Sequence, residues 1–232
     1  MDTPYDIVSL GSVSSTQDVS SSLIAETGNP TLVVATRQTA GRGRQGRTWL
    51  QPDRALFSSF AFASSWPPGV RPIITLCAAV AVAESIDDVL GVNTDIKWPN
   101  DLLLDGKKVA GILVEVSGDI VTVGCGANLW WPDAPSHAGA LGKEPPDENV
   151  EMQLASGWVD RLITFLEYGA GDWPRDSYLD RSWTIGRSVE WDSGAGFARD
   201  LDATGGLVVD TKSGTITIRE GEVHTLEPGK NR

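Results

Sequence analysis

Two tight turns inside one apolar stretch constrain the fold of this chain more than any other feature. Asp105-Gly106 separates strand-like runs at residues 101–104 and 107–116, and Gly118-Asp119 leads into a third run at residues 120–129. Aspartate–glycine is a strong hairpin signal because both residues tolerate the positive φ angles of a two-residue turn. Strands joined in this way pair antiparallel. The sequence therefore predicts a sheet that contains consecutive β-hairpins.

The other apolar segments predict helices and further strands around these hairpins. Patterning and turn residues predict strands at residues 5–13, 31–36, 55–63 and 95–98, and helices at residues 16–27, 70–90 and 151–169, the first with its N-cap at Ser14, Ser15 or Thr16. Residues 130–149, rich in proline, glycine and acidic side chains, predict a long surface connection. We expect an α+β fold in which a mixed β-sheet has helices packed on it, over residues 1–180.

The character of the sequence changes after residue 174. Short β-type runs at residues 188–191, 207–209, 215–219 and 222–226 are separated by glycine and aspartate turns. This pattern predicts a small β-barrel as a second domain at residues 181–232.

Composition and charge limit the kind of protein. The 232 residues are 41% hydrophobic and carry a net charge of −12, which is typical of a folded protein without a basic face for nucleic acid. The longest apolar run, Ile73 to Ala83, is shorter than the roughly 18 residues that cross a bilayer, and the start of the chain lacks a basic signal region. Cys77 and Cys125 lie in apolar segments and are expected to be buried thiols. We therefore expect a cytoplasmic protein that binds neither DNA nor a membrane.

An arginine-rich segment at residues 37–49 departs from this acidic background. Its four arginines, with no acidic residue among them, indicate a small anionic ligand. Residues 41–46 match the pattern G-x-G-x-x-G, but a dinucleotide-binding motif needs a helix to open on the glycines. The segment continues with Trp49 and Pro52 and shows no helical pattern. Two interpretations stay open: a loop that approaches a ligand with backbone amides and arginines, or a flexible surface loop.

Three polar positions on the predicted hairpin strands are further candidates. Lys108 could neutralise a reacting carboxylate or phosphate, and Gly111 would let a flat ligand lie against its strand. The alternatives are a solvated edge lysine and a glycine at a bulge. Asn128 ends an apolar strand and offers a donor and an acceptor to a nucleotide. Asn100 and Asp101 could equally cap a turn.

Taken together, the order and spacing of these segments resemble the biotin protein ligases. The segments are Ser-Thr-Gln at residues 15–17, the glutamine and arginine-rich run at residues 38–49, Lys-Trp-Pro-Asn-Asp at residues 97–101, residues 107–115 and Gly-Cys-Gly-Ala-Asn at residues 124–128. The resemblance implies a class II synthetase-like biotin/lipoate ligase fold followed by a small SH3-like domain.

The resemblance also implies roles for individual residues. Biotin-binding residues would be Ser15, Thr16, Gln17, Gln38, Gly41, Arg42, Gly43, Arg44, Lys108 and Gly111. Nucleotide-binding residues would be Arg42, Arg44, Arg47, Trp49, Asn100, Lys108 and Asn128. Lys108 and Arg44 would be catalytic, and Asp101 would place Mg²⁺. Gln17 stands where the family usually has asparagine, and His137 and His224 lie outside the motifs and are expected to be structural.

The implied activity is ATP-dependent formation of biotinyl-5′-AMP and transfer of biotin to a lysine of a biotin carboxyl carrier domain. Regulatory members of the family carry an N-terminal DNA-binding domain, whereas this sequence begins at the catalytic domain, so we expect no repressor function. A lipoate or octanoate ligase, and a noncatalytic module that holds biotin or a nucleotide, are the alternatives. Both a monomer and a homodimer are compatible with the sequence.

Overall fold

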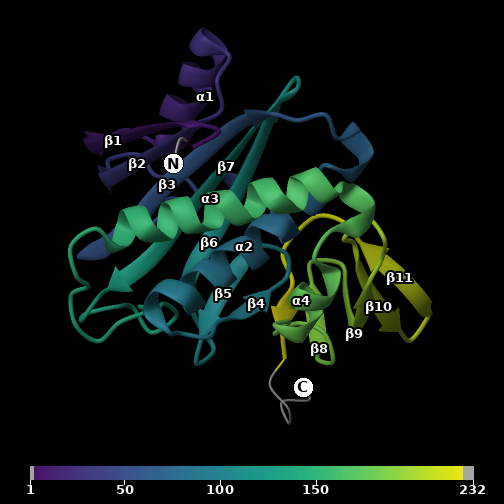
Figure 1. The fold of residues 1–232 in the computed structure, drawn as a ribbon. Helices are drawn as coiled ribbons and strands as arrows, with labels where there is room; N and C mark the ends of the chain where they lie inside the picture. The colour runs from purple at the N-terminus through teal and green to yellow at the C-terminus, as the bar shows by residue number, and fades with distance from the viewer. Residues whose placement is uncertain (1–2, 227–232) are drawn as a thin grey trace.

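A seven-stranded mixed sheet forms the centre of the computed structural model, which describes residues 3–226 (Figure 1). Its strands, in the order β1-β2-β3-β7-β6-β5-β4, are β1 (Asp6–Val13), β2 (Thr31–Gln38), β3 (Arg54–Ala63), β7 (Ile120–Trp130), β6 (Lys107–Ser117), β5 (Asp101–Leu104) and β4 (Asp95–Lys97). β1 and β2 are parallel, and the other neighbouring strands pair antiparallel. The predicted mixed sheet is confirmed.

Both predicted hairpin turns are present. Asp105 and Gly106 have φ angles of 51° and 74°, and Gly118 has a φ of 61°. These left-handed conformations suit glycine and aspartate, and they give the tight reversals that place β5, β6 and β7 side by side.

Two long helices cover one face of the sheet. α2 (Ile73–Leu90) and α3 (Val150–Tyr168) lie side by side in Figure 1, and the indole of Trp158 in α3 donates a hydrogen bond to Ser58 Oγ of β3. The predicted start of α2 was three residues early, because residues 68–70 form a separate 3-10 turn before Pro72. The short α4 (Arg175–Asp180) was not predicted, since six residues show no helical period.

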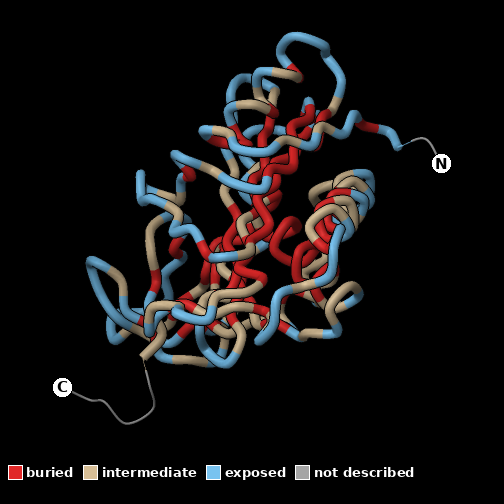
Figure 2. The backbone as a smooth tube through the Cα atoms, turned by 90° about the vertical axis from the view of Figure 1, so that its left-hand side faces the viewer, coloured by how far each residue is buried: buried red, intermediate tan, exposed pale blue. Residues whose placement is uncertain are grey.

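The two faces of β7 differ in a way that creates space. Val123 and Cys125 point into the core against α2, whereas the alternate positions are Gly124 and Gly126. The side chain of Gln17, from α1 (Thr16–Thr27), lies against Gly124, so α1 packs on the second face. Figure 2 shows the buried backbone through the middle of the molecule, with exposed segments around it. On the second face of the sheet, β7 therefore has no side chains at Gly124 and Gly126, which leaves space above the strand.

The C-terminal region forms a five-stranded antiparallel sheet. Its strands, in the order β11-β10-β9-β8-β12, are β11 (Gly214–Ile218), β10 (Leu207–Thr211), β9 (Gly194–Leu201), β8 (Ser188–Trp191) and β12 (His224–Thr225). β9 was not predicted because two glycines and two charges interrupt its alternation. Among residues 3–226 the pairings run from β11 to β12 without joining these two strands, so the predicted barrel is seen as an antiparallel sheet; residues 227–232 lie outside the described residues.

Residues 130–149 were predicted as a surface connection, which is wrong for part of the segment. Ala138 and Leu141 are buried, and Ala138 and Gly142 form bridges with Lys108 and Trp130 at the ends of β6 and β7. The segment therefore forms a wall beside these strands rather than a free loop.

Both cysteines are buried and free, as predicted, and burial raises the pKa of each thiol to about 12. Both thiols are consequently expected to stay protonated at neutral pH. Within residues 3–226, no helix has the length and apolar character needed to cross a membrane.

Candidate active site

A pocket opens on the glycine face of the sheet and collects nearly all predicted site residues. Its walls come from the start of α1, residues 42–50, the start of β5, the middle of β6 and β7, and residues 221–223 of the C-terminal region. The predicted residues in its lining are Ser15, Thr16, Gln17, Gln38, Arg42, Gly43, Arg44, Arg47, Trp49, Asn100, Asp101, Lys108, Gly111 and Asn128. Gly41 lies behind the lining, where its carbonyl accepts a hydrogen bond from the Trp49 amide.

Residues 39–49, which we call the arginine loop, follow directly from β2. Its ends meet through hydrogen bonds from Gly43 N to Arg47 O and from Trp49 N to Gly41 O. A 3-10 turn at residues 44–46 and then β3 follow the glycines, in place of the helix that a dinucleotide-binding motif requires. The loop thus approaches the pocket with both backbone and arginines.

One end of the pocket, which we call the neutral end, consists of Thr16, Gln17, Gln38 and Ser59. Gln38 Oε1 accepts hydrogen bonds from Thr16 N at 2.8 Å and Thr16 Oγ1 at 3.2 Å, and Thr16 Oγ1 lies 2.7 Å from Ser59 Oγ. Ser15 occupies the N-cap position of α1 but makes no side-chain cap bond. The amide of Gln38 therefore satisfies the first turn of α1, a role that the sequence assigned to a hydroxyl.

Trp49 covers the middle of the pocket floor. A Cβ added at Gly111 or Gly126 would lie 2.9 Å or 2.8 Å from the indole, so only glycine allows this close approach. The Lys108 ammonium lies 5.3 Å from the centre of the indole ring. In this structure the chain's own indole lies against Gly111, and its buried Nε1 has no hydrogen-bond partner among the described residues.

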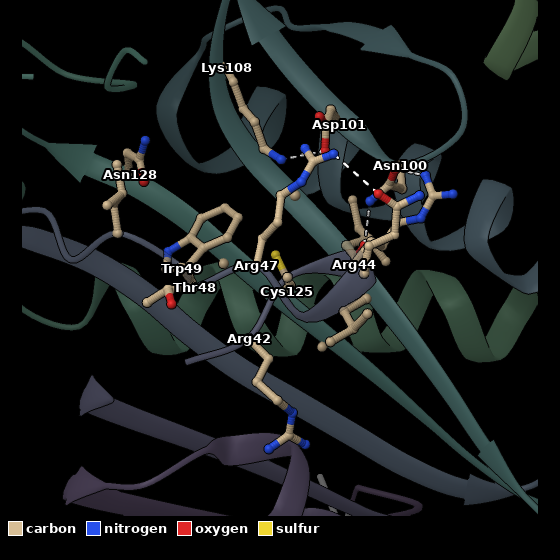
Figure 3. Close-up of a pocket in the computed structure, with 18 of the residues that line it drawn as sticks. Arg42, Arg44, Arg47, Thr48, Trp49, Asn100, Asp101, Lys108, Cys125 and Asn128 are labelled. Carbon is tan, nitrogen blue, oxygen red and sulfur yellow. Dashed lines mark hydrogen bonds and ion pairs between the residues drawn. The ribbon is translucent and has the colours of Figure 1, made fainter. Parts of the chain in front are cut away.

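The opposite end of the pocket, which we call the charged end, consists of Arg44, Arg47, Asn100, Asp101, Lys108 and Glu222 (Figure 3). Lys108 Nζ lies 2.6 Å from Asp101 Oδ1. Arg44 donates to Asn100 Oδ1 and to the carbonyl of Gly221, both at 2.9 Å. Asn100 is itself held by a bond from its Nδ2 to the Ile112 carbonyl, so it positions Arg44 rather than capping a turn.

Glu222 brings the C-terminal region into this end of the pocket. Its carboxylate accepts two hydrogen bonds from the Arg47 guanidinium, which lower the pKa of Glu222 to about 2. The sequence contained no signal for this residue, since it is 175 positions away from Arg47 along the chain.

Arg42 lies away from the charged end. Its guanidinium donates two hydrogen bonds to Asp18 of α1, at 2.9 Å and 2.7 Å, and Figure 3 shows it pointing away from Lys108 and Arg44. These bonds lower the pKa of Asp18 and raise that of Arg42. Arg42, which was predicted to contact both biotin and the nucleotide, thus lies nearer the neutral end than the charged end.

Asn128, near the end of β7, contacts the wall formed by residues 131–149, and His137 belongs to that wall. Asn128 Nδ2 donates to the Gly139 carbonyl at 2.8 Å, so its amide holds this wall in place. His137, which the sequence left outside the motifs, lines the pocket. No group of three or more histidine, cysteine, aspartate or glutamate side chains suited to a metal occurs within residues 3–226.

This arrangement defines a class of protein. A mixed sheet carries one pocket with buried neutral hydrogen-bonding groups at one end and two arginines and a lysine at the other. Such a site suits a small acid that is bound beside a phosphate group, because the cations offset the repulsion between two anions.

The chain belongs to the biotin/lipoate A/B protein ligase family, whose model matches residues 10–128. It is 36% identical to the biotin–acetyl-CoA-carboxylase ligase of Mycobacterium tuberculosis over 83% of this chain and 77% of that protein. It is 43% identical to the bifunctional ligase/repressor BirA of Bacillus subtilis over 83% of this chain, and spans 65% of the length of that relative.

Solved structures of similar fold support the same assignment. The biotin protein ligase of Aquifex aeolicus in complex with biotin and ATP matches with a TM-score of 0.76 and 28% identity, over 95% of this chain and 98% of that one. The biotin protein ligase of Leishmania major in complex with biotinyl-5-AMP matches with a TM-score of 0.66 and 25% identity, over 97% of this chain and 100% of that one. The predicted ligase fold is confirmed for the mixed sheet and its helices.

Proposed function

We propose that this protein joins biotin to ATP to form biotinyl-5′-AMP and then transfers the biotinyl group to a lysine of a biotin carboxyl carrier domain. The observation that carries the proposal is the division of one pocket into a neutral end and a charged end. Biotin has a neutral ureido head and an anionic carboxylate, so it can span such a pocket with its carboxylate beside Lys108. The complexes of the Aquifex and Leishmania ligases with biotin, ATP and biotinyl-5-AMP support this choice.

The first step joins two anions. An oxygen of the biotin carboxylate attacks the α-phosphorus of ATP, the bond to the β-phosphate oxygen breaks, and pyrophosphate leaves. Two unit charges about 4 Å apart interact by roughly 4 kcal/mol at an effective dielectric constant of 20. Lys108 and Arg44 offset this repulsion from fixed positions. Lys108 is paired with Asp101 at 2.6 Å through one N–H, and the other N–H groups of its ammonium can turn to the substrate anions.

In the second step, the ε-amine of the carrier lysine attacks the acyl carbon, the amine loses a proton and AMP leaves with the electron pair. AMP is a good leaving group, so positioning and exclusion of water matter more than a strong base. Trp49 and the arginine loop supply that cover, and Arg44 ties the loop to Asn100 and to Gly221. This closure would retain the intermediate until the carrier lysine arrives.

The charged end fits a magnesium ion that enters with ATP. Mg²⁺ is commonly bound by one or two carboxylates together with substrate phosphates, and Asp101 is a carboxylate in the pocket lining. Asp101 would hold the ion once Lys108 turns to the substrate, and the ion would supply additional positive charge for the phosphates.

The remaining features of the function rest on the family. We propose a cytoplasmic enzyme whose residues 1–180 form the catalytic domain and whose residues 181–232 form an SH3-like domain. Its partner would be the carrier domain of an acyl-CoA carboxylase, with no role for DNA or a membrane. Either a monomer or a homodimer is compatible with this function.

ATP–pyrophosphate exchange by the purified protein tests this function. Biotin, lipoate and octanoate are supplied separately, and exchange with biotin alone supports biotin adenylation. Exchange with lipoate or octanoate instead would assign the protein to the rival ligases of its family. No exchange with any acid would favour a noncatalytic binding module and contradict the roles of Lys108 and Arg44.

A further inference from the structure

Glu115 of β6 borders the neutral end of the pocket and has no role in the chemistry described above. Its Oε2 accepts a hydrogen bond from Gln17 Nε2 at 3.0 Å and lies 3.4 Å from Nη2 of Arg42. Arg42 also makes its two shorter bonds to Asp18, so it has another partner when Glu115 is removed. The contact that depends on Glu115 is therefore the one to Gln17.

The surroundings of Gln17 determine which way its amide faces. Besides Glu115, Nε2 lies 3.4 Å from the Thr122 carbonyl and 3.5 Å from the Leu113 carbonyl. If the amide were rotated by 180°, Oε1 would face the same three oxygen atoms. An amide oxygen cannot donate a hydrogen bond to any of them, so this orientation is excluded. A carboxylate is the strongest of these acceptors, because a charged partner strengthens a hydrogen bond.

The opposite atom of the same amide has no partner of its own. Gln17 is 5% exposed, and its Oε1 is buried without a hydrogen-bond partner among the described residues. A Cβ at Gly124 would lie 2.7 Å from this oxygen, so the glycine floor is what lets the amide oxygen lie there. A buried acceptor without a donor costs free energy, which a donor on the substrate would recover.

We propose that Glu115 is a positioning residue that fixes the Gln17 amide so that its oxygen accepts an N–H from the head group of the substrate. Glu115 thereby favours a head group with N–H donors, such as a cyclic urea, over a head group with none, such as a dithiolane. This inference rests on the proposed function, since it concerns the recognition of the acid that is adenylated.

Calorimetric titration of the full chain with biotin tests the proposal without the need for catalysis. Glu115→Ala should weaken biotin binding about 10-fold, in keeping with the loss of a hydrogen bond to a charged group. Glu115→Gln keeps an acceptor for Gln17 and should bind within about 3-fold of the original protein. Glu26→Ala, which removes an exposed carboxylate near the other end of α1, is the matched control and should have no effect.

A double-substitution cycle separates positioning from a general structural role. Gln17→Met removes the amide while keeping a side chain of similar length. If Glu115 acts through that amide, adding Glu115→Ala to Gln17→Met should change biotin affinity by less than about 2-fold. The maximal exchange rate at saturating biotin should change little in Glu115→Ala, because the charged end is intact.

An analogue with one methylated ureido nitrogen gives a second readout. The original protein should prefer biotin over at least one of the two N-methyl isomers, and Glu115→Ala should reduce that preference. If Glu115→Ala does not fold, Glu115→Asp replaces it in this experiment. The aspartate keeps the charge but shortens the side chain by one methylene, so it should show the same loss of preference for biotin.

The outcomes separate the two proposals. Biotin binding by Glu115→Ala and Glu115→Asp equal to that of the original protein, or full additivity with Gln17→Met, would overturn the role of Glu115 alone. A protein that fails to bind biotin at all would overturn the proposed function itself.

Discussion

The two ends of the pocket are built in different ways. At the neutral end, Thr16, Gln38 and Ser59 are held by short hydrogen bonds between regular elements, and Thr16 and Ser59 are almost fully buried. At the charged end, Lys108 and Arg47 are partly exposed and are paired with carboxylates of the same chain. The neutral end is therefore held by buried hydrogen bonds, whereas the charged end is held by partly exposed ion pairs.

This difference has an energetic consequence. Neutral hydrogen bonds in a buried site depend little on salt or pH, so the neutral end should bind its group in the same way under most conditions. Ion pairs near the surface are screened by salt and contribute little to stability, so Asp101 and Glu222 can be displaced by phosphate at small cost. The charged end should therefore control the rate, and the neutral end the affinity for the acid.

Removing Lys108 should have the largest effect and should leave the neutral end intact. Lys108→Ala takes away the cation beside the reacting groups, so we expect ATP–pyrophosphate exchange to fall by about 10²- to 10³-fold or more. Biotin binding, measured by calorimetry, should change much less. Lys107→Ala, at the exposed neighbouring position of β6, is the control. Exchange close to that of the original protein in Lys108→Ala would remove Lys108 from the mechanism.

Removing Arg44 should separate formation of the intermediate from its retention. Arg44→Gly loses the bonds to Asn100 and Gly221, so the arginine loop should release biotinyl-5′-AMP about 10- to 100-fold faster. Labelling of a mixture of proteins in the presence of biotin and ATP measures this release, since free intermediate reacts with any exposed amine. Arg37→Gly, at an exposed position of β2, is the control. Labelling that stays confined to the carrier domain would contradict the retaining role.

At the neutral end, Thr16→Val should weaken both stability and binding. The substitution keeps the shape of the side chain but removes the hydroxyl that links Ser59 to Gln38. Leaving buried polar groups unpaired costs about 1–3 kcal/mol of the free energy of unfolding, which urea denaturation measures. Thr36→Val, on an exposed position of β2, should cost much less. Equal losses in the two variants would mean that the neutral end is no more ordered than the surface.

The same contrast explains what could be predicted from the sequence. The hairpin that carries Lys108 could be predicted locally from Asp105-Gly106, and the helix that begins at Thr16 from its N-cap residues, whereas their roles in a site came from the resemblance to the family. Glu222 could not, because its contact with Arg47 depends on how the C-terminal sheet lies against the pocket. Glu115 was within a recognised motif, but only the structure shows that its side chain meets Gln17. Local turns and helical or strand periodicity can thus be predicted from the sequence, whereas contacts between side chains that are distant along the chain cannot.

The smallest expected effect is the change in the free energy of unfolding when the Glu222 carboxylate is removed. Glu222 lies where the charged end meets the C-terminal sheet. The pair with Arg47 lowers the pKa of Glu222 from 4.5 to about 2, so its stabilisation is present above pH 4.5 and is lost as the pH falls towards 2. Since both side chains are more than a third exposed, Glu222→Gln should cost less than about 1 kcal/mol near pH 7. Urea denaturation at decreasing pH should show this difference shrinking below pH 4.5, and added salt should reduce it at neutral pH. A difference that persisted at low pH would show that Glu222 holds the C-terminal sheet by packing, and the charged end would then be as preorganised as the neutral end.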